Sequence, residues 1–156
     1  MNIRSINVIG ALVVLSAVFA LTASAEPGMQ SKLVAVDGSN AGGMIEASPT
    51  SHDVVGPGTY DVQVTANFHG LLPDTGYRIL RWFDLNADGV CTGVSPVTFP
   101  GNPTVTTTSG GSGELHVELS RGAPFLDGVR FDVVFRVVDL DGNTVLQSDC
   151  FTGTVK

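Results

Sequence analysis

Apolar and polar residues alternate strictly along several segments of the chain, and this feature restricts its fold more than any other. One side of the segment 59–69 carries only apolar residues: Tyr60, Val62, Val64, Ala66 and Phe68. The same alternation occurs in 114–120. In 129–139 one face is apolar, but the other mixes charged residues with Val134 and Val138, as expected for a central strand partly covered on its second side. A period of two is the period of a β-strand that turns one face to a core and the other to water. These segments therefore predict half-buried strands.

Turn-forming residues separate the apolar runs at intervals of about ten residues, which is typical of an all-β sandwich or barrel. We expect strands at 32–36, 44–48, 60–69, 77–83, 104–108, 114–120, 129–139 and 144–151. Glycine-rich 109–113 and the Asp-Gly-Asn turn at 141–143 suit hairpins, because their residues tolerate positive φ. The pattern predicts an antiparallel Greek-key β-sandwich of about seven or eight strands.

The first 25 residues have the layout of a cleaved secretory signal peptide. Arg4 gives a positive start, 8–21 is almost entirely apolar, and Ala23-Ser24-Ala25 is a small-residue cleavage site. The alternative is an uncleaved membrane anchor, but the apolar run is shorter than the roughly 20 residues that cross a bilayer. We therefore expect residues 26–156 to form one extracellular or periplasmic domain without stable membrane insertion.

The expected mature domain is acidic. The whole chain has 8 basic and 15 acidic side chains, so removal of Arg4 leaves 7 and 15, a formal charge of −8. Nucleic acids and anionic membrane surfaces need clustered Lys and Arg, so we expect neither as a partner. The charge is compatible with divalent cations or cationic partners, but a role in solubility alone is the simpler explanation.

The two cysteines, Cys91 and Cys150, both lie in the expected mature domain. An isolated pair in an oxidising compartment most often forms a disulfide. Such a cross-link closes a loop of about 60 residues and contributes roughly 4 kcal/mol in the chain-entropy model. A metal-binding or catalytic pair has less support, because no Cys-x-x-Cys spacing is present.

A short motif precedes the predicted strand 77–83. Leu71-x-Pro73-x-x-x-Tyr77 resembles the tyrosine corner of fibronectin type III and other immunoglobulin-like sandwiches. The resemblance implies that the Tyr77 hydroxyl bonds to backbone a few residues upstream; it carries information about the fold and identifies no catalytic residue. In fibronectin type III domains the corner comes late, near the sixth strand, whereas about three strands precede it here.

The segment after that strand is similar to a calcium-binding loop. Asp84-x-Asn86-x-Asp88-Gly89 matches the first half of an EF-hand loop, in which the carbonyl of Val90 is the next ligand. Ser95 stands where the EF-hand has its bidentate glutamate. The segment also resembles the excalibur motif, whose cysteine lies one position later than the one here.

We therefore expect a calcium site of modest affinity at Asp84, Asn86, Asp88 and Val90, which the second acidic turn at 139–143 could complete. The alternative is that both segments are ordinary surface turns, since Asp, Asn and Gly are common turn formers.

No catalytic set is recognisable. His52, His69 and His116 lie on different segments, without the spacing of a copper or zinc site. The glycines around Ser112 do not form a Gly-x-Ser-x-Gly elbow, because Glu114 takes the last glycine position. Trp82, the only tryptophan, lies either buried on the second face of its strand or exposed as a platform for carbohydrate or protein.

We expect a noncatalytic secreted module, stabilised by calcium, for partner binding or for surface or extracellular assembly. Its partner would be a protein or a carbohydrate. The only lysines are Lys32 and Lys156, so few charges protect the sheet edges, and self-association through those edges is a further expectation. The alternative is a small secreted enzyme or enzyme inhibitor that uses an acidic cleft.

Overall fold

The computed structural model describes residues 29–49, 60–93, 95–122, 124–126 and 128–155. The predicted signal peptide, residues 1–25, lies outside this part of the chain, and so does His52.

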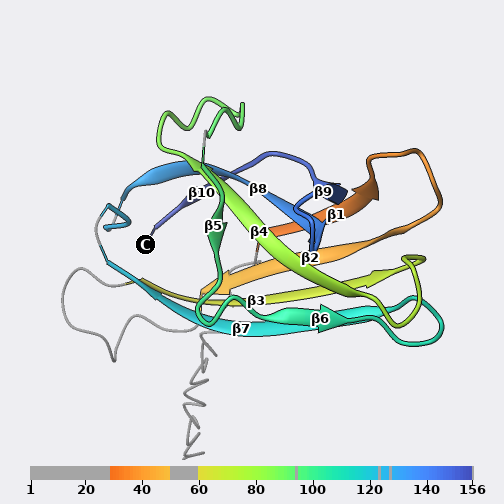
Figure 1. The fold of residues 1–156 in the computed structure, drawn as a ribbon. Coiled ribbons are helices and arrows are strands. Elements are labelled where there is room, and N and C mark those ends of the chain that lie inside the picture. The colour runs from red at the N-terminus through yellow and green to blue at the C-terminus, as the bar shows by residue number, and fades with distance from the viewer. Residues whose placement is uncertain (1–28, 50–59, 94, 123, 127, 156) are drawn as a thin grey trace, which may run out of the picture.

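The described residues form ten strands and no helix (Figure 1). The strands are β1 (Met29–Ala35), β2 (Gly42–Pro49), β3 (Tyr60–His69), β4 (Gly76–Asp84), β5 (Val97–Thr98), β6 (Thr104–Thr106), β7 (Gly113–Arg121), β8 (Arg130–Asp139), β9 (Thr144–Ser148) and β10 (Phe151–Thr154). The predicted all-β class is confirmed.

The strands belong to one antiparallel sheet in the order β5-β4-β8-β9-β1-β2-β3-β7, with β6 also paired to β4 and β10 to β8. Figure 1 shows the sheet curling into a half-barrel, with β3 and β7 below and β8 and β10 above. Two stacked sheets were expected, but the hydrogen-bonded path runs through a single sheet. The immunoglobulin-like Greek key stays a prediction.

The alternation of β3 produces the expected burial. Its described inward side chains are at most 7% exposed, and they are Val62, Val64, Ala66 and Phe68. Asn67 and His69 on the other face are exposed. In β7, Leu115 and Leu119 are buried while Glu114, His116 and Glu118 are exposed. Both strands thus line the concave side of the sheet with apolar side chains and present polar ones to water.

Strand β8 is the centre of the sheet. It pairs with β4 along most of its length, and its opposite edge pairs with β9 and with β10. One face carries the buried residues Phe131, Val133, Phe135 and Val137. The other face also holds buried side chains, Asp132, Val134 and Val138, which confirms the expectation of a central strand covered on its second side.

Aromatic rings fill the core beside β8. Phe83, Phe125 and Phe131 meet edge to face with centroids 4.9–5.7 Å apart. Phe135 stacks on Phe99 at 6.5 Å and on Phe151 at 5.8 Å. Such pairs add to the burial of their apolar area.

The last predicted strand, 144–151, is divided into β9 and β10. Between them, the Ser148 hydroxyl replaces a backbone partner of β8. It accepts a hydrogen bond from the Phe135 backbone N–H at 2.9 Å and donates one to the Asp149 carbonyl at 2.8 Å. The Asp149 N–H donates to the hydroxyl of Ser31. These side-chain bonds end the β9 ladder and turn the chain toward β10.

Candidate functional site

The motif at 71–77 forms a closed corner. Tyr77 is 2% exposed, and its hydroxyl accepts a hydrogen bond from the Leu72 backbone N–H at 3.3 Å. The predicted bond to upstream backbone is therefore present. Asp74 adopts a φ of 50°, which asparagine and aspartate tolerate better than most residues.

Thr107, which the sequence analysis did not identify, fastens this corner to the segment after β6. Its buried hydroxyl donates to the Leu72 carbonyl at 2.6 Å and accepts from the Thr75 N–H at 3.0 Å. A single threonine in a run of three gives no local signal of this role.

The acidic loop, defined here as residues 84–93, folds around its own first carboxylate. Asp84 ends β4 and is 9% exposed. Its carboxylate accepts from the Asn86 N–H at 3.0 Å, from the Thr92 N–H at 3.2 Å, and from the Thr92 hydroxyl. These donors, above all the Thr92 hydroxyl, lower the pKa of Asp84, because they stabilise the charged form.

Hydrogen bonds from backbone N–H groups to carboxylates also hold the rest of the loop. Asp88 accepts from the Val90 N–H at 2.9 Å, and Gly89 has a φ of 83°, which favours glycine. The Gly89 N–H donates at 2.7 Å to the carboxylate of Asp132 on β8. Asp132 is 0% exposed and also accepts from the Thr152 hydroxyl. In the β4–β8 register it lies opposite Asp84.

The buried carboxylate of Asp132 thus binds the acidic loop, and the sequence analysis did not identify this residue. One signal could have found it: Asp132 lies on the face of segment 129–139 that also carries Val134 and Val138, and a charge on a covered face needs specific partners. What the sequence could not give is the pairing of β8 with β4, which brings Asp132 to the acidic loop.

The predicted disulfide is present. Cys91 and Cys150 are bonded with Cα atoms 5.6 Å apart across a sequence separation of 59 residues. The bond joins the acidic loop to the connection between β9 and β10. The loop is therefore held to neighbouring strands both covalently and through Asp132.

The calcium prediction stays a prediction. Within the described ranges, no group of three or more His, Cys, Asp or Glu side chains is placed to hold a metal ion. The carboxylates of Asp84 and Asp88 accept bonds from the loop itself, while Asn86 and Val90 are exposed. In the second acidic turn, the carboxylate of Asp139 accepts hydrogen bonds from the side-chain amide and the backbone N–H of Asn143, and these bonds lower the pKa of Asp139.

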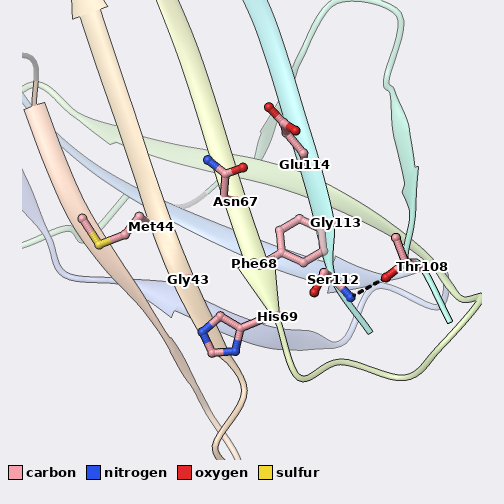
Figure 2. A pocket seen from close by; sticks show the side chains of 9 residues that line it. All are labelled: Gly43, Met44, Asn67, Phe68, His69, Thr108, Ser112, Gly113 and Glu114. Atoms are coloured by element: carbon pink, nitrogen blue, oxygen red, sulfur yellow. Dashed lines mark hydrogen bonds between the residues drawn. The ribbon is translucent and has the colours of Figure 1, made fainter. Parts of the chain in front are cut away.

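An open groove lies elsewhere, where β2, β3 and β7 meet the loop before β7 (Figure 2). It has a volume of about 630 Å³. Figure 2 shows Met44, Asn67 and Glu114 on three neighbouring strands, and the register places them in one row. The lining residues are Gly43, Met44, Asn67, Phe68, His69, Thr108, Ser112, Gly113 and Glu114.

Two glycines shape the floor of the groove. Gly43 and Gly113 lie on either side of Phe68 in the strand register. A Cβ atom on Gly113 would come within 2.5 Å of the Phe68 ring, so the ring occupies the space that a side chain at position 113 would need. The exposed side chains of the groove offer a thioether, an amide, an imidazole and a carboxylate, which suits binding of a mixed polar and apolar ligand, whereas the Phe68 ring is 2% exposed and belongs to the core.

The groove opens onto a strand edge. Among the residues that the structure describes, β7 pairs with β3 on one side and with no strand on the other. The Thr108 N–H donates to the Ser112 carbonyl just before β7 begins. No described strand therefore hydrogen-bonds to the backbone groups on that side of β7, although Val105 of β6 packs against Gly113 at its start.

The other candidate residues have structural contacts. The ring nitrogens of His116 lie 3.1 Å from the Gln63 amide and from the Thr65 hydroxyl. Trp82 is half-buried, and the guanidinium of Arg136 lies over its ring at 4.3 Å. One face of the indole is therefore covered by a cation, and Trp82 is neither fully buried nor a bare aromatic platform.

None of the described segments contains a helix with the length and apolar character that a membrane crossing requires. Comparison of the sequence with protein-family models and with curated proteins finds no match.

Proposed function

We propose that the protein is a noncatalytic, extracytoplasmic binding and assembly module whose binding surface is the open edge of β7 together with the groove at its start. The observation that carries the proposal is the nine-residue strand β7, which has one partner strand among the described residues. The disulfide supports the compartment, because such bonds persist in oxidising surroundings.

An open strand edge binds by adding another strand. Its N–H and C=O groups supply main-chain hydrogen bonds, and neighbouring pockets select the side chains of the added segment. Glu114 and Glu118 are exposed on β7, and β7 carries no lysine that would discourage pairing. The ligand best suited to this edge is an extended segment of protein with Lys or Arg opposite the two glutamates.

In this proposal, the groove determines which side chains of the added segment can bind. It lies at the beginning of β7, so a strand added to the edge runs directly past it. Met44 is 43% exposed on β2, with β3 and β7 between it and the edge, so it offers an apolar contact only to a side chain that reaches across the groove. Self-association is a second arm of the proposal, since β7 can also pair with β7 in antiparallel fashion, although such a pair lacks the Lys or Arg that would best face the two glutamates.

The finer fold assignment and the calcium remain part of the proposal. The bond between Tyr77 and Leu72 supports an immunoglobulin-like corner, although the corner alone carries no binding residue. Calcium would act as a stabiliser of the acidic loop. The alternative enzyme with an acidic cleft gains no support from Asp84 and Asp132, because both carboxylates accept hydrogen bonds from neighbouring backbone and hydroxyl groups.

Amide hydrogen exchange tests the proposal directly. In the monomeric mature domain, every second amide of β7 should exchange quickly, because only alternate amides donate to β3. Addition of a binding peptide, selected from a library of extended segments, should protect the remaining amides. Protection of all β7 amides in the free monomer would contradict an open edge.

Sedimentation at increasing protein concentration tests the self-association arm. Glu118→Lys replaces an acidic partner of the basic ligand segment with a like charge and should weaken peptide binding. Asp141→Lys is the matched control, because it makes the same charge change at an exposed turn away from β7. Equal effects of the two substitutions would count against the β7 edge as the binding surface.

A further inference from the structure

Two arginines lie on the outer, convex side of the sheet without an acidic partner. Arg78 of β4 and Arg136 of β8 both occupy outward positions in the register of these strands. Arg78 donates to the Leu140 carbonyl at 3.0 Å, and the guanidinium of Arg136 lies 4.3 Å from the centre of the Trp82 ring. Within the described part of the chain, neither guanidinium contacts a carboxylate. Because arginine stays protonated in proteins, both positive charges remain uncompensated there.

The two arginines are diagonal neighbours. Arg136 lies opposite Leu80, which is two residues from Arg78 on β4. Such positions on an antiparallel pair place Cβ atoms about 7 Å apart. Leu80 and Trp82 are half-buried beside them, and we call these four residues the basic face. Arginine and tryptophan are enriched among the residues that contribute most to protein–protein binding.

A matching pair of carboxylates lies on another part of the outer side. Asp61 of β3 and Glu118 of β7 form the acidic face. Glu118 lies opposite Gln63, two residues from Asp61, so the carboxylates have the same diagonal spacing as the arginines. Asp61 accepts a hydrogen bond from the Ser120 hydroxyl. A hollow of about 170 Å³ lies between these side chains, which is several times the roughly 30 Å³ of a water and admits the end of a long side chain.

The basic face and the acidic face point away from each other. Inward side chains of β3 and β7, such as Val62 and Leu119, belong to the same core as Phe135 and Val137 of β8. The two parts of the curled sheet therefore turn their inner sides together and their outer sides to opposite sides of the molecule (Figure 1). One copy cannot bring its own two faces into contact, whereas a second copy can supply the missing face.

We propose that the basic face of one copy binds the acidic face of a second copy. The two guanidiniums meet two carboxylates at matched spacing, and Arg–carboxylate pairs can form two parallel hydrogen bonds. Because the faces differ and point in opposite directions, the contact is heterologous and repeats into an open chain of copies. This contact deepens the proposed assembly role, on which it rests, but it needs no strand addition at the β7 edge.

Sedimentation over a range of protein concentrations tests this contact. The average mass of the mature domain should rise past that of a dimer, because the contact does not close. Arg136→Glu should weaken association by more than about tenfold, since like charges then face each other. Arg130→Glu makes the same charge change at an exposed position where β8 begins, and it should associate as the wild type does. A monomeric wild type, or equal effects of both substitutions, would overturn the proposal.

Charge exchange between two variants gives a second readout. Arg78→Glu with Arg136→Glu leaves two acidic faces, and Asp61→Lys with Glu118→Lys leaves two basic ones. Each variant alone should be monomeric, and an equimolar mixture should associate. The Asp61 and Glu118 variant should also shorten chains of the wild type, because it can bind at one end only; this readout does not require the arginine variant to fold. A mixture that stays monomeric with both variants folded, or wild-type chains of unchanged length, would contradict the head-to-tail contact.

Binding of the selected β7 peptide separates this contact from the β7 edge. Arg136→Glu should bind the peptide as tightly as the wild type, because Arg136 lies on β8. A parallel loss of peptide binding and association would assign self-association to the β7 edge and overturn the head-to-tail contact. A wild type that forms open chains but binds no peptide would contradict the β7 edge alone.

Discussion

The acidic loop and the β7 edge differ in how far their hydrogen-bonding groups are already used. In the acidic loop, Asp84, Asp88 and Asp132 accept bonds from neighbouring N–H and hydroxyl groups, and Cys91 is cross-linked. Along β7, one side of the described backbone has no partner strand. Composition alone draws attention to the loop, whereas the side without a partner strand among the described residues belongs to β7, whose sequence is ordinary.

Removing the disulfide should change the stability of the acidic loop relative to β7 more than any other substitution. The double substitution Cys91→Ser with Cys150→Ser should lower the free energy of unfolding by about 4 kcal/mol, because the unfolded chain regains the freedom of a long loop. Urea denaturation measures the loss. Amide exchange should increase in the acidic loop more than in β7; the opposite distribution would show that the cross-link also supports the edge.

Asp132→Ala should have the next largest effect. It leaves the Gly89 N–H and the Thr152 hydroxyl without their acceptor, and we expect a loss of about 3 kcal/mol in urea denaturation. Asp141→Ala, at an exposed turn, is the control and should change stability by less than about 0.5 kcal/mol. Similar losses in both variants would mean that the loop does not depend on this buried acceptor.

The pH dependence of the acidic loop should give a smaller effect. The pKa of Asp84 is lowered from 3.8 in the folded state, so its stabilisation is present above that value and is lost as the pH falls through the folded pKa. Thr92→Val removes the hydroxyl that lowers this pKa most. Its Tm should fall below that of the wild type near neutral pH, and the difference should shrink as the pH falls through the lowered pKa of Asp84. A difference independent of pH would assign the effect to packing.

Calcium should have the smallest effect. If Asp84, Asn86, Asp88 and the Val90 carbonyl bind the ion, titration calorimetry of the mature domain should give heat, and Tm should rise at about millimolar calcium. Asn86→Ala should remove that response while changing Tm little without calcium, because Asn86 is exposed. The absence of both heat and a Tm change would identify the loop as one held by its own hydrogen bonds.

The sequence predicted the features that depend on local periodicity or on a simple count. The bounds of β3 were predicted to the residue, because five apolar positions alternate without interruption. The disulfide followed from the presence of two cysteines, and the Tyr77 bond followed from a short motif. These inferences need no knowledge of which strands are neighbours.

Features that depend on strand pairing were missed or only partly predicted. Periodicity tells which face of a strand is buried, but it does not tell whether the strands form two sheets or one curled sheet. The roles of Asp132 and Thr107 arise from partners far away in the sequence. The two-residue strand β5 is too short for any periodic signal.

The position of β1 in the sheet has a consequence for how the chain acquires its structure. β1 pairs with β2 on one side and with β9 on the other, Leu33 lying opposite Ser148. The middle of the sheet therefore joins segments separated by more than a hundred residues, and its ladder cannot be completed while β9 is still being synthesised. Closure of so distant a pair is entropically slow, and we expect folding on the slow timescale of proteins with many non-local contacts.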